Sequence, residues 1–251
     1  VACLVGSEMC IRDRIYGVNT GFGNLSQIII DSDDIEKLQI NLVRSHASGI
    51  GKPLGLGVVR TVIFLKLLTF AKGYSGVSLQ LVKKIIQLFN KDILPVIPKK
   101  GSVGASGDLA PLGHMALVLI GEGEVFYEGK RLKTALVLKK AKIKPLSLKP
   151  KEGLSLINGT QVSTAIAIKT LLNGKNLLLS ADIAGAVSVE NSFSSRKVFQ
   201  KRIHDLKQHP GQRTSAKNIY KLLNKSEIVH SHNNCSKIQD PYSFRCIPHV
   251  H

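Results

Sequence analysis

The sequence contains no tryptophan, only two methionines and 5% aromatic residues, and its 17 acidic residues face 35 basic ones. A formal net charge of +18 suggests an acidic partner such as nucleic acid. The basic residues are scattered, however, without interleaved aromatic side chains or zinc-finger spacing. We therefore expect a lysine-rich surface and no nucleic-acid partner. A basic nucleic-acid-binding module stays open as the alternative from another functional class.

Cysteine and long apolar runs are also scarce. Cys3, Cys10, Cys235 and Cys246 match no disulfide framework, which favours a reducing cytoplasm. Apolar stretches such as TVIFLKLL are interrupted by lysine well before the roughly 18 residues that a membrane helix needs. We expect a soluble protein with no membrane partner. Its 251 residues, 43% of them hydrophobic, suffice for one large domain or two small ones.

Both ends of the chain look abrupt. The first fourteen residues, VACLVGSEMCIRDR, have no clear period, resemble a translated adapter sequence and lack the features of a secretory signal. We interpret 1–14 as a non-native leader, 15–150 as an N-terminal region and 151–251 as the truncated start of a helical region. The sudden end after CIPHVH predicts a fragment that lacks both ends.

Periodicity predicts a mainly α fold with a little sheet. Apolar residues at helical spacing predict helices over 33–48, 55–73, 78–93, 109–123 and 154–193, and a further helix between the HPGQ turn and Leu223. Alternation around Glu128-Gly129 predicts a small hairpin. Residues 134–150 are ambiguous, and the polar tail 231–251 reads as irregular. The long, small-residue-rich helical region after Gly153 is typical of a bundle core.

The stretch GSVGASGDLAPLGHMA, residues 101–116, holds a serine among glycines. A nucleophile elbow needs glycine where Asp108 stands, and neither a Walker loop nor a G-x-G-x-x-G fingerprint is present. A glycine turn before a helix is the simplest interpretation. A tight bend, however, also lets the nitrogen of Gly107 approach the carbonyl carbon of Ala105, because glycine has no Cβ. Ring closure with loss of water, including the Ser106 hydroxyl, would leave a conjugated alkene, an electrophile that no ordinary side chain supplies.

This stretch resembles the signature of the aromatic amino acid ammonia-lyases. YGVNTGFG, NLVRSHASGIG, GLSLINGTQ, HPGQ and QDPYSFRCIP resemble further motifs of that family, in the same order. The resemblance implies an ammonia-lyase-like helical bundle with a small α+β N-terminal region around the loop. It also implies that Ala105, Ser106 and Gly107 form 4-methylidene-imidazol-5-one (MIO), with no external cofactor. Family members are homotetramers, so the full-length protein is expected to be one.

The chain most resembles the family members that act on histidine. This implies a small-molecule amino acid substrate and elimination of ammonia from L-histidine to give trans-urocanate, a step of histidine catabolism. Tyrosine as substrate, an MIO aminomutase and an inactive fragment are the alternatives. A glutamate and an aromatic residue of the family's pocket come from a C-terminal half that this chain does not contain. The sequence also departs from the family pattern at Gly113, Phe244 and His249, where Ala, Leu and Gln are expected.

The resemblance assigns roles to individual residues. Tyr16, in a glycine-rich loop, matches the catalytic tyrosine, and a phenol needs a positive neighbourhood to act as a base. Arg245 matches the carboxylate-binding arginine, whose guanidinium holds a carboxylate by two parallel hydrogen bonds. Asn158 matches the catalytic asparagine near the amine. Tyr242, also assigned to catalysis, and Gln239, assigned to substrate binding, match residues that line the ring and the substrate.

His46 matches the position that selects the substrate side chain. Imidazole pairs well with another imidazole or a phenol and poorly with a phenyl ring, which favours histidine, then tyrosine, over phenylalanine. Each assignment has a plain structural alternative: a loop tyrosine for Tyr16, an ion pair for Arg245, a helix cap for Asn158 and a satisfied helix residue for His46. His230, His232 and Cys235 have a spacing that suits a metal, but a fourth ligand is not evident, and we expect no metal site.

Overall fold

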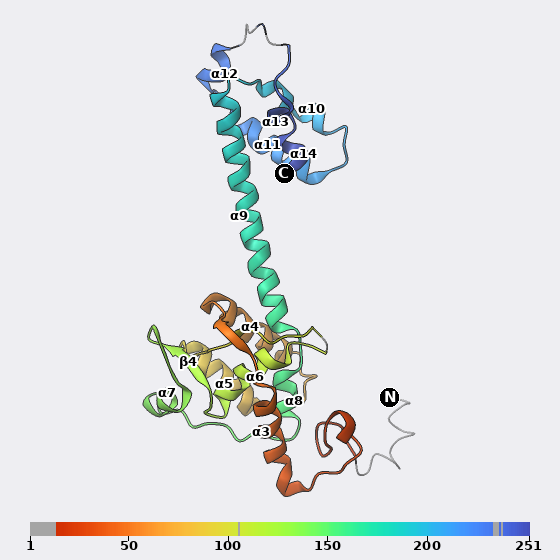
Figure 1. Ribbon diagram of the computed structural model, residues 1–251, viewed down its shortest axis with the longest axis vertical. Helices are drawn as coiled ribbons and strands as arrows, with labels where there is room; N and C mark the ends of the chain where they lie inside the picture. The colour runs from red at the N-terminus through yellow and green to blue at the C-terminus, as the bar shows by residue number, and fades with distance from the viewer. Residues whose placement is uncertain (1–13, 105, 233–235, 237) are drawn as a thin grey trace. The chain divides into compact units, whose positions relative to one another are not determined.

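The computed structural model describes residues 14–104, 106–232, 236 and 238–251, and these are mostly helical, as predicted (Figure 1). The chain divides into two compact units between Lys169 and Thr170. Residues 151–169 belong to the first unit, where α8 (Glu152–Ile157) packs against α3 (Ile35–His46) and α6 (Leu109–Leu119). Of the leader proposed over 1–14, all but Arg14 lies outside the described residues.

The four longer helices that lie wholly in the first unit follow the hydrophobic pattern. α3, α4 (Leu56–Ala71), α5 (Leu79–Asn90) and α6 lie inside the predicted helical ranges. The ambiguous stretch 134–150 forms one short helix, α7 (Thr134–Lys140), followed by irregular chain. The remaining elements are the 3-10 turns η1 (Gly23–Leu25) and η2 (Ser32–Asp34), and the strands β1 (Ile50–Pro53), β2 (Leu94–Pro95), β3 (Pro98–Lys100), β4 (Glu124–Tyr127) and β5 (Lys130–Lys133).

The strands form two small antiparallel sheets. β4 and β5 make the predicted hairpin, with β2 on the outer side of β4, and β1 pairs with β3. Glu128 and Gly129 both have positive φ, 50° and 73°, as a two-residue hairpin turn of the primed type requires. The strands β1, β2 and β3 were not predicted from the sequence, since each is short and carries a proline.

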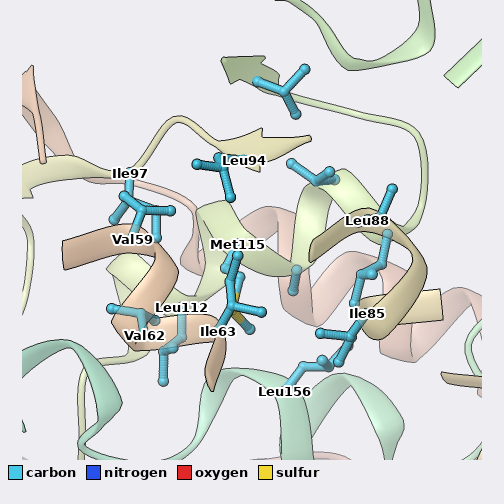
Figure 2. Packing of buried hydrophobic residues seen from close by; sticks show 14 of the residues in the cluster. Val59, Val62, Ile63, Ile85, Leu88, Leu94, Ile97, Leu112, Met115 and Leu156 are labelled. Carbon is cyan, nitrogen blue, oxygen red and sulfur yellow. The ribbon is translucent and has the colours of Figure 1, made fainter. Parts of the chain in front are cut away.

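One apolar core occupies the first unit, between α4, α5 and α6 (Figure 2). α4 contributes Val59, Val62 and Ile63, and Met115 of α6 lies close to Ile63. These side chains are at most 4% exposed. Burying a side chain of this size contributes about 1.5–3 kcal/mol relative to leaving it in water, so this core holds the helices that carry the loops described below.

The second unit has a smaller core. α9 (Gln161–Asn191) begins in the first unit and ends in the second, where it packs with η3 (Arg196–Phe199) and α11 (Pro210–Leu222). The core residues are Ala186, Val189, Phe199, Ile219 and Leu223. The other helices are α10 (Lys201–His204), α12 (Glu227–Ser231), α13 (Tyr242–Arg245) and α14 (Ile247–Val250). The prediction of an irregular tail was therefore wrong over 242–250, where prolines open two short helices.

The predicted helix over 154–193 is interrupted. The chain leaves the helical conformation at 158–160, where Gly159 has a φ of 136°, and α9 begins only at Gln161. Between the parts of α9 that enter the two cores, Leu171, Leu172, Leu177 and Ile183 are about half exposed or more, so the described residues do not bury this stretch. None of the helices in the described ranges is both long and apolar enough to cross a membrane.

Candidate active site

The loop before α6 bends through backbone conformations that side chains disfavour. Gly104, Ser106 and Gly107 have φ values of 70°, 61° and 115°. A serine at positive φ is strained, and such strain gathers at functional sites. Ser106 is also exposed. Ala105, the first residue of the expected ring, lies outside the described residues.

Gly107 is held against Gly159, far along the chain. The two glycines form an isolated parallel bridge, and the nitrogen of Asp108 donates to the carbonyl oxygen of Gly159 at 2.7 Å. A Cβ placed on Gly107 would lie 2.6 Å from that oxygen. Only glycine fits here, and the same missing Cβ is what a backbone reaction of this nitrogen requires.

Asp108 is buried directly behind the loop, at 1% exposure. Its carboxylate accepts hydrogen bonds from the Ser102 hydroxyl (2.8 Å), the Ser163 nitrogen (2.8 Å) and the Ser163 hydroxyl (2.5 Å). Burial by itself would raise the pKa of Asp108, but the hydrogen bonds from Ser163 and Ser102 outweigh it and hold this pKa below its usual value. The carboxylate is therefore ionised at neutral pH. α6 begins at the next residue, so the positive end of its dipole adjoins the loop.

Tyr16 lies in the turn before η1, at 53% exposure, and its ring meets that of Phe22 edge-on with centroids 5.9 Å apart. This turn is tied to α8 by Gln39, which is fully buried on α3. Gln39 Nε2 donates to the Gly17 carbonyl at 3.3 Å, and Gln39 Oε1 accepts from the Gly153 nitrogen at 2.9 Å. Gln39 was not predicted from the sequence, because a glutamine in an amphipathic helix is typical of the exposed face.

Asn158 follows α8 and does not open α9, so it is not the N-cap that the plain structural interpretation suggested. Its side chain is exposed, while its backbone is fixed at both ends. The Asn158 nitrogen donates to the Leu154 carbonyl at 3.0 Å, and the Asn158 carbonyl accepts from Lys66 Nζ at 3.0 Å. The residue that pairs with Gly107 comes next, so Asn158 adjoins the loop.

His46 ends α3, and its ring is oriented by its own helix. Nδ1 lies 2.8 Å from the Leu42 carbonyl oxygen and 3.1 Å from the Ser45 hydroxyl. A carbonyl only accepts, so the Leu42 contact places the proton of a neutral ring on Nδ1. Nε2 is then an acceptor, and it has no hydrogen-bond partner among the described residues. Gly113 of α6 lies close by, since a Cβ there would be 3.0 Å from the Ala47 nitrogen.

The second unit carries the other three candidates. Arg245 Nε donates to the Asp240 carbonyl at 2.8 Å. With the Gln239 amide oriented so that its oxygen faces Arg245, it accepts from Nη1 at 2.8 Å. The Asp240 carboxylate accepts from the Ser195 nitrogen at 2.7 Å, which anchors this segment to the chain after α9. Tyr242, at the start of α13, is 74% exposed.

The candidates therefore form two sets, one in each unit. In the first unit, Ser106 and Gly107 lie beside the Asn158–Gly159 turn. Gln39 connects the turn that carries Tyr16 to α8, the helix that precedes Asn158. In the second, Gln239 contacts Arg245. Of the candidate metal residues, His230 lies on α12 and His232 follows it, while Cys235 lies outside the described residues. Within the part of the chain that the structure describes, no three or more His, Cys, Asp or Glu side chains are grouped so that they could bind one metal ion.

Comparison with known proteins decides the family. The family model for aromatic amino acid lyases matches residues 4–251. The chain belongs to the aromatic amino acid lyase family. It is 48% identical over 257 residues to a histidine ammonia-lyase of Myxococcus xanthus (strain DK1622), an alignment that covers 100% of this chain and 51% of the relative. The chain thus spans about half the length of the curated relatives it matches.

Solved structures of lyases and aminomutases share the fold. Phenylalanine aminomutase from Pantoea agglomerans superposes with a TM-score of 0.86 at 31% identity, over 99% of this chain and 51% of that one. Histidine ammonia-lyase from Trypanosoma cruzi gives a TM-score of 0.83 at 34% identity, over 99% of this chain and 46% of that one. The predicted ammonia-lyase-like fold is confirmed.

Proposed function

We propose that the protein carrying this chain is a carbon–nitrogen lyase that eliminates ammonia from L-histidine to give trans-urocanate, a step of histidine catabolism. The observation that carries the proposal is the strained Ser106–Gly107 backbone held against Gly159, in a chain of the aromatic amino acid lyase family. Its relatives at 48–50% identity include several histidine ammonia-lyases, which supports histidine as the substrate.

The residues present fit an MIO group formed from Ala105, Ser106 and Gly107. Closing the ring joins the Gly107 nitrogen to the Ala105 carbonyl carbon and releases two waters, one of them carrying the Ser106 hydroxyl oxygen. Glycine at 107 leaves room for that approach, and the positive φ of Ser106 and Gly107 bends the chain in advance. When formed, the group supplies an electrophilic alkene, which no unmodified side chain offers. No cofactor from outside the chain is needed for it.

The chain's own residues bind the substrate and move its proton. Tyr16 Oη takes the proton from the substrate's β-carbon, and Asn158 binds near the amine. Arg245 binds the carboxylate with the guanidinium nitrogens that the Asp240 carbonyl does not occupy, and Gln239 holds that guanidinium in place. Tyr242 and Gln239 line the site.

His46 selects the side chain of the substrate. With its proton on Nδ1, its Nε2 accepts a hydrogen bond from a donor on the substrate. The imidazole N–H of histidine and the hydroxyl of tyrosine are such donors, and a phenyl ring has none. The proposal therefore ranks histidine first and tyrosine second, in agreement with the relatives.

The test uses the full-length protein with this chain in place. Intact-mass spectrometry is expected to show a deficit of two water molecules. Incubation with L-histidine, L-tyrosine and L-phenylalanine is expected to release ammonia fastest from histidine, with trans-urocanate as product. Ser106→Ala, which lacks the hydroxyl that must leave, loses both the deficit and turnover, while Ser180→Ala, an exposed serine on α9, keeps both.

Three outcomes would overturn the proposal in different ways. A β-amino acid product indicates an aminomutase, the activity of the Pantoea agglomerans structural relative. Fastest release from tyrosine indicates a tyrosine ammonia-lyase. An unmodified mass together with salt-sensitive binding to DNA or RNA indicates a basic nucleic-acid-binding protein, because such binding weakens as phosphate counterions compete.

We further propose a cytoplasmic homotetramer with no nucleic-acid or membrane partner. The exposed leucines of α9 support association with further protein, because monomers rarely expose large contiguous apolar patches. Light scattering on the full-length protein measures the mass of the assembly, and a monomeric mass contradicts the tetramer.

A further inference from the structure

Lys66 is the largest fully buried side chain among the described residues, at 0% exposure in the middle of α4. Its neighbours on that helix are the core residues Val62, Ile63 and Phe70, and Nζ lies 5.5 Å from the centre of the Phe70 ring. A lysine is almost never buried so completely without a partner, since removing an ammonium from water costs several kcal/mol. No carboxylate of the described residues lies within 4 Å of Nζ. Other polar groups must therefore accept the hydrogen bonds of the buried Nζ.

The ammonium is bonded to backbone oxygens at the end of α8. Nζ donates to the Ser155 carbonyl at 3.1 Å and to the Asn158 carbonyl at 3.0 Å. The last carbonyls of a helix have no partner within it and carry the negative end of its dipole, so a cation placed there satisfies both needs. Lys66 is thus a buried cap of α8, supplied by a different helix.

Two opposing effects act on the pKa of Lys66. Burial lowers its pKa to about 7, and the negative charge of Asp108 acts in the opposite direction. The charge of Asp108 therefore partly offsets the burial, while the Ser155 and Asn158 carbonyls accept the hydrogen bonds of Nζ. Asp108 follows Gly107 in the chain and Asn158 precedes Gly159, so these groups belong to the two segments that meet at the bridge.

A continuous chain of contacts leads from Lys66 to the strained loop. Lys66 holds the Asn158 carbonyl, the next residue is Gly159, and Gly159 accepts from the nitrogen of Asp108. On the same helix, Thr69 Oγ1 accepts from Gln161 Nε2 at 3.1 Å. Helix α4 therefore makes hydrogen bonds to residues at both ends of the 158–161 turn. We propose that Lys66 is a positioning residue, which fixes the Asn158–Gly159 turn against Gly107 and thereby aligns the Gly107 backbone for ring closure.

The inference rests on the proposed function, because it concerns formation of the MIO group from residues 105–107. The experiment measures loss of the two waters from these residues, and not turnover of substrate. In the full-length protein, Lys66→Met keeps the length of the side chain and removes its charge and donors. Lys66→Arg keeps the charge and donors. Val62→Ala is the matched control, since it removes apolar packing from the same helix and leaves both hydrogen bonds of Lys66 in place. Mass spectrometry of the peptide that contains residues 101–116 gives the dehydrated fraction as a function of time.

We expect Lys66→Met to lose the two waters at least about tenfold more slowly than wild type, as the loss of a charge-assisted hydrogen bond implies. Lys66→Arg is expected to restore most of the modification, and Val62→Ala to be modified at the wild-type rate despite its lower stability. Hydrogen exchange at the Asp108 amide, which is bonded to Gly159, should accelerate about tenfold in Lys66→Met and not in Val62→Ala. Lys66→Gln, which keeps a donor without the charge, replaces the methionine variant if the latter does not fold.

Normal modification of a folded Lys66→Met or Lys66→Gln protein overturns the inference and leaves the proposed function intact. Equal slowing in Val62→Ala also overturns it, because the effect is then one of general stability. A wild-type protein that never loses the two waters refutes the proposed function itself. Circular dichroism on each variant establishes the folded fraction on which these comparisons depend.

Discussion

Asp108 caps the first turn of α9 from another part of the chain, through two hydrogen bonds from Ser163. The backbone nitrogen and the hydroxyl of Ser163 donate to the two carboxylate oxygens at 2.8 and 2.5 Å. A negative charge at this end also complements the dipole of a 31-residue helix. The residue that follows the strained loop is therefore also the residue that fixes the start of the longest helix.

Asp108→Asn is expected to lower the free energy of unfolding of the full-length protein at pH 7 by about 1–3 kcal/mol, because the amide turns an N–H toward groups that already donate. The pKa of Asp108 lies below its unfolded value. Its stabilisation is thus present above about pH 4 and is lost as the pH falls through the folded pKa. Urea unfolding from pH 7 to pH 3 measures this, with Asp31→Asn, an exposed residue whose side chain caps no helix, as control. An equal acid dependence in wild type and Asp108→Asn would contradict the prediction.

Gly107→Ala is expected to be far more disruptive than Gly104→Ala. Both glycines have positive φ, which costs an alanine about 1–2 kcal/mol. A Cβ on Gly104 meets nothing within 4 Å, whereas on Gly107 it meets the Gly159 backbone. Thermal unfolding should show a small shift for Gly104→Ala and a loss of several degrees or more for Gly107→Ala. Similar shifts for the two variants would mean that the bridge to Gly159 contributes little.

His46→Phe is expected to lower kcat/KM for L-histidine by about tenfold or more, because the substrate imidazole loses its acceptor at Nε2. The same variant should raise the preference for L-phenylalanine relative to histidine. Steady-state kinetics with both substrates test this, and His46→Asn, which retains a polar side chain, should lose less. An unchanged substrate ratio in His46→Phe would remove His46 from substrate selection.

Arg245→Lys is expected to raise KM for L-histidine about tenfold with a smaller change in kcat. A lysine offers a single charged point where the guanidinium offers two parallel donors, and it cannot also keep the contacts to Asp240 and Gln239. Arg202→Lys, an exposed residue in the same unit, is the control and should be unchanged. A large fall in kcat at constant KM would assign Arg245 a role other than carboxylate binding.

Much of the fold follows from local pattern, and the missing parts depend on contacts between distant residues. The spacing of apolar residues predicted α3, α4, α5 and α6, and Glu128-Gly129 predicted the hairpin. The pairing of β1 with β3 and the short helices α13 and α14 have no such pattern. The break before α9 depends on a single glycine, Gly159, whose role is clear only beside Gly107.

The same distinction applies to the site. The glycine-rich composition of residues 101–108 indicated the loop. The roles of Tyr16, Asn158 and Arg245 come from the family resemblance and stay predictions. Lys66 and Gln39 were missed because their partners are mainly backbone atoms, which leave no trace in the sequence. A lone lysine within the apolar stretch TVIFLKLLTF was the one available signal for Lys66, and it served only to exclude a membrane helix.

The boundary between Lys169 and Thr170 has a consequence for the order of synthesis. The described partners of the loop (Gly159, Ser163 and, through the turn, Lys66) all precede that boundary. Gln239, Tyr242 and Arg245 come after it. Because chains emerge from the ribosome amino end first and units fold as they appear, these described partners can pack around the loop before Arg245 has been translated. Folding around the loop is thus separable in time from synthesis of the segment that carries Gln239, Tyr242 and Arg245.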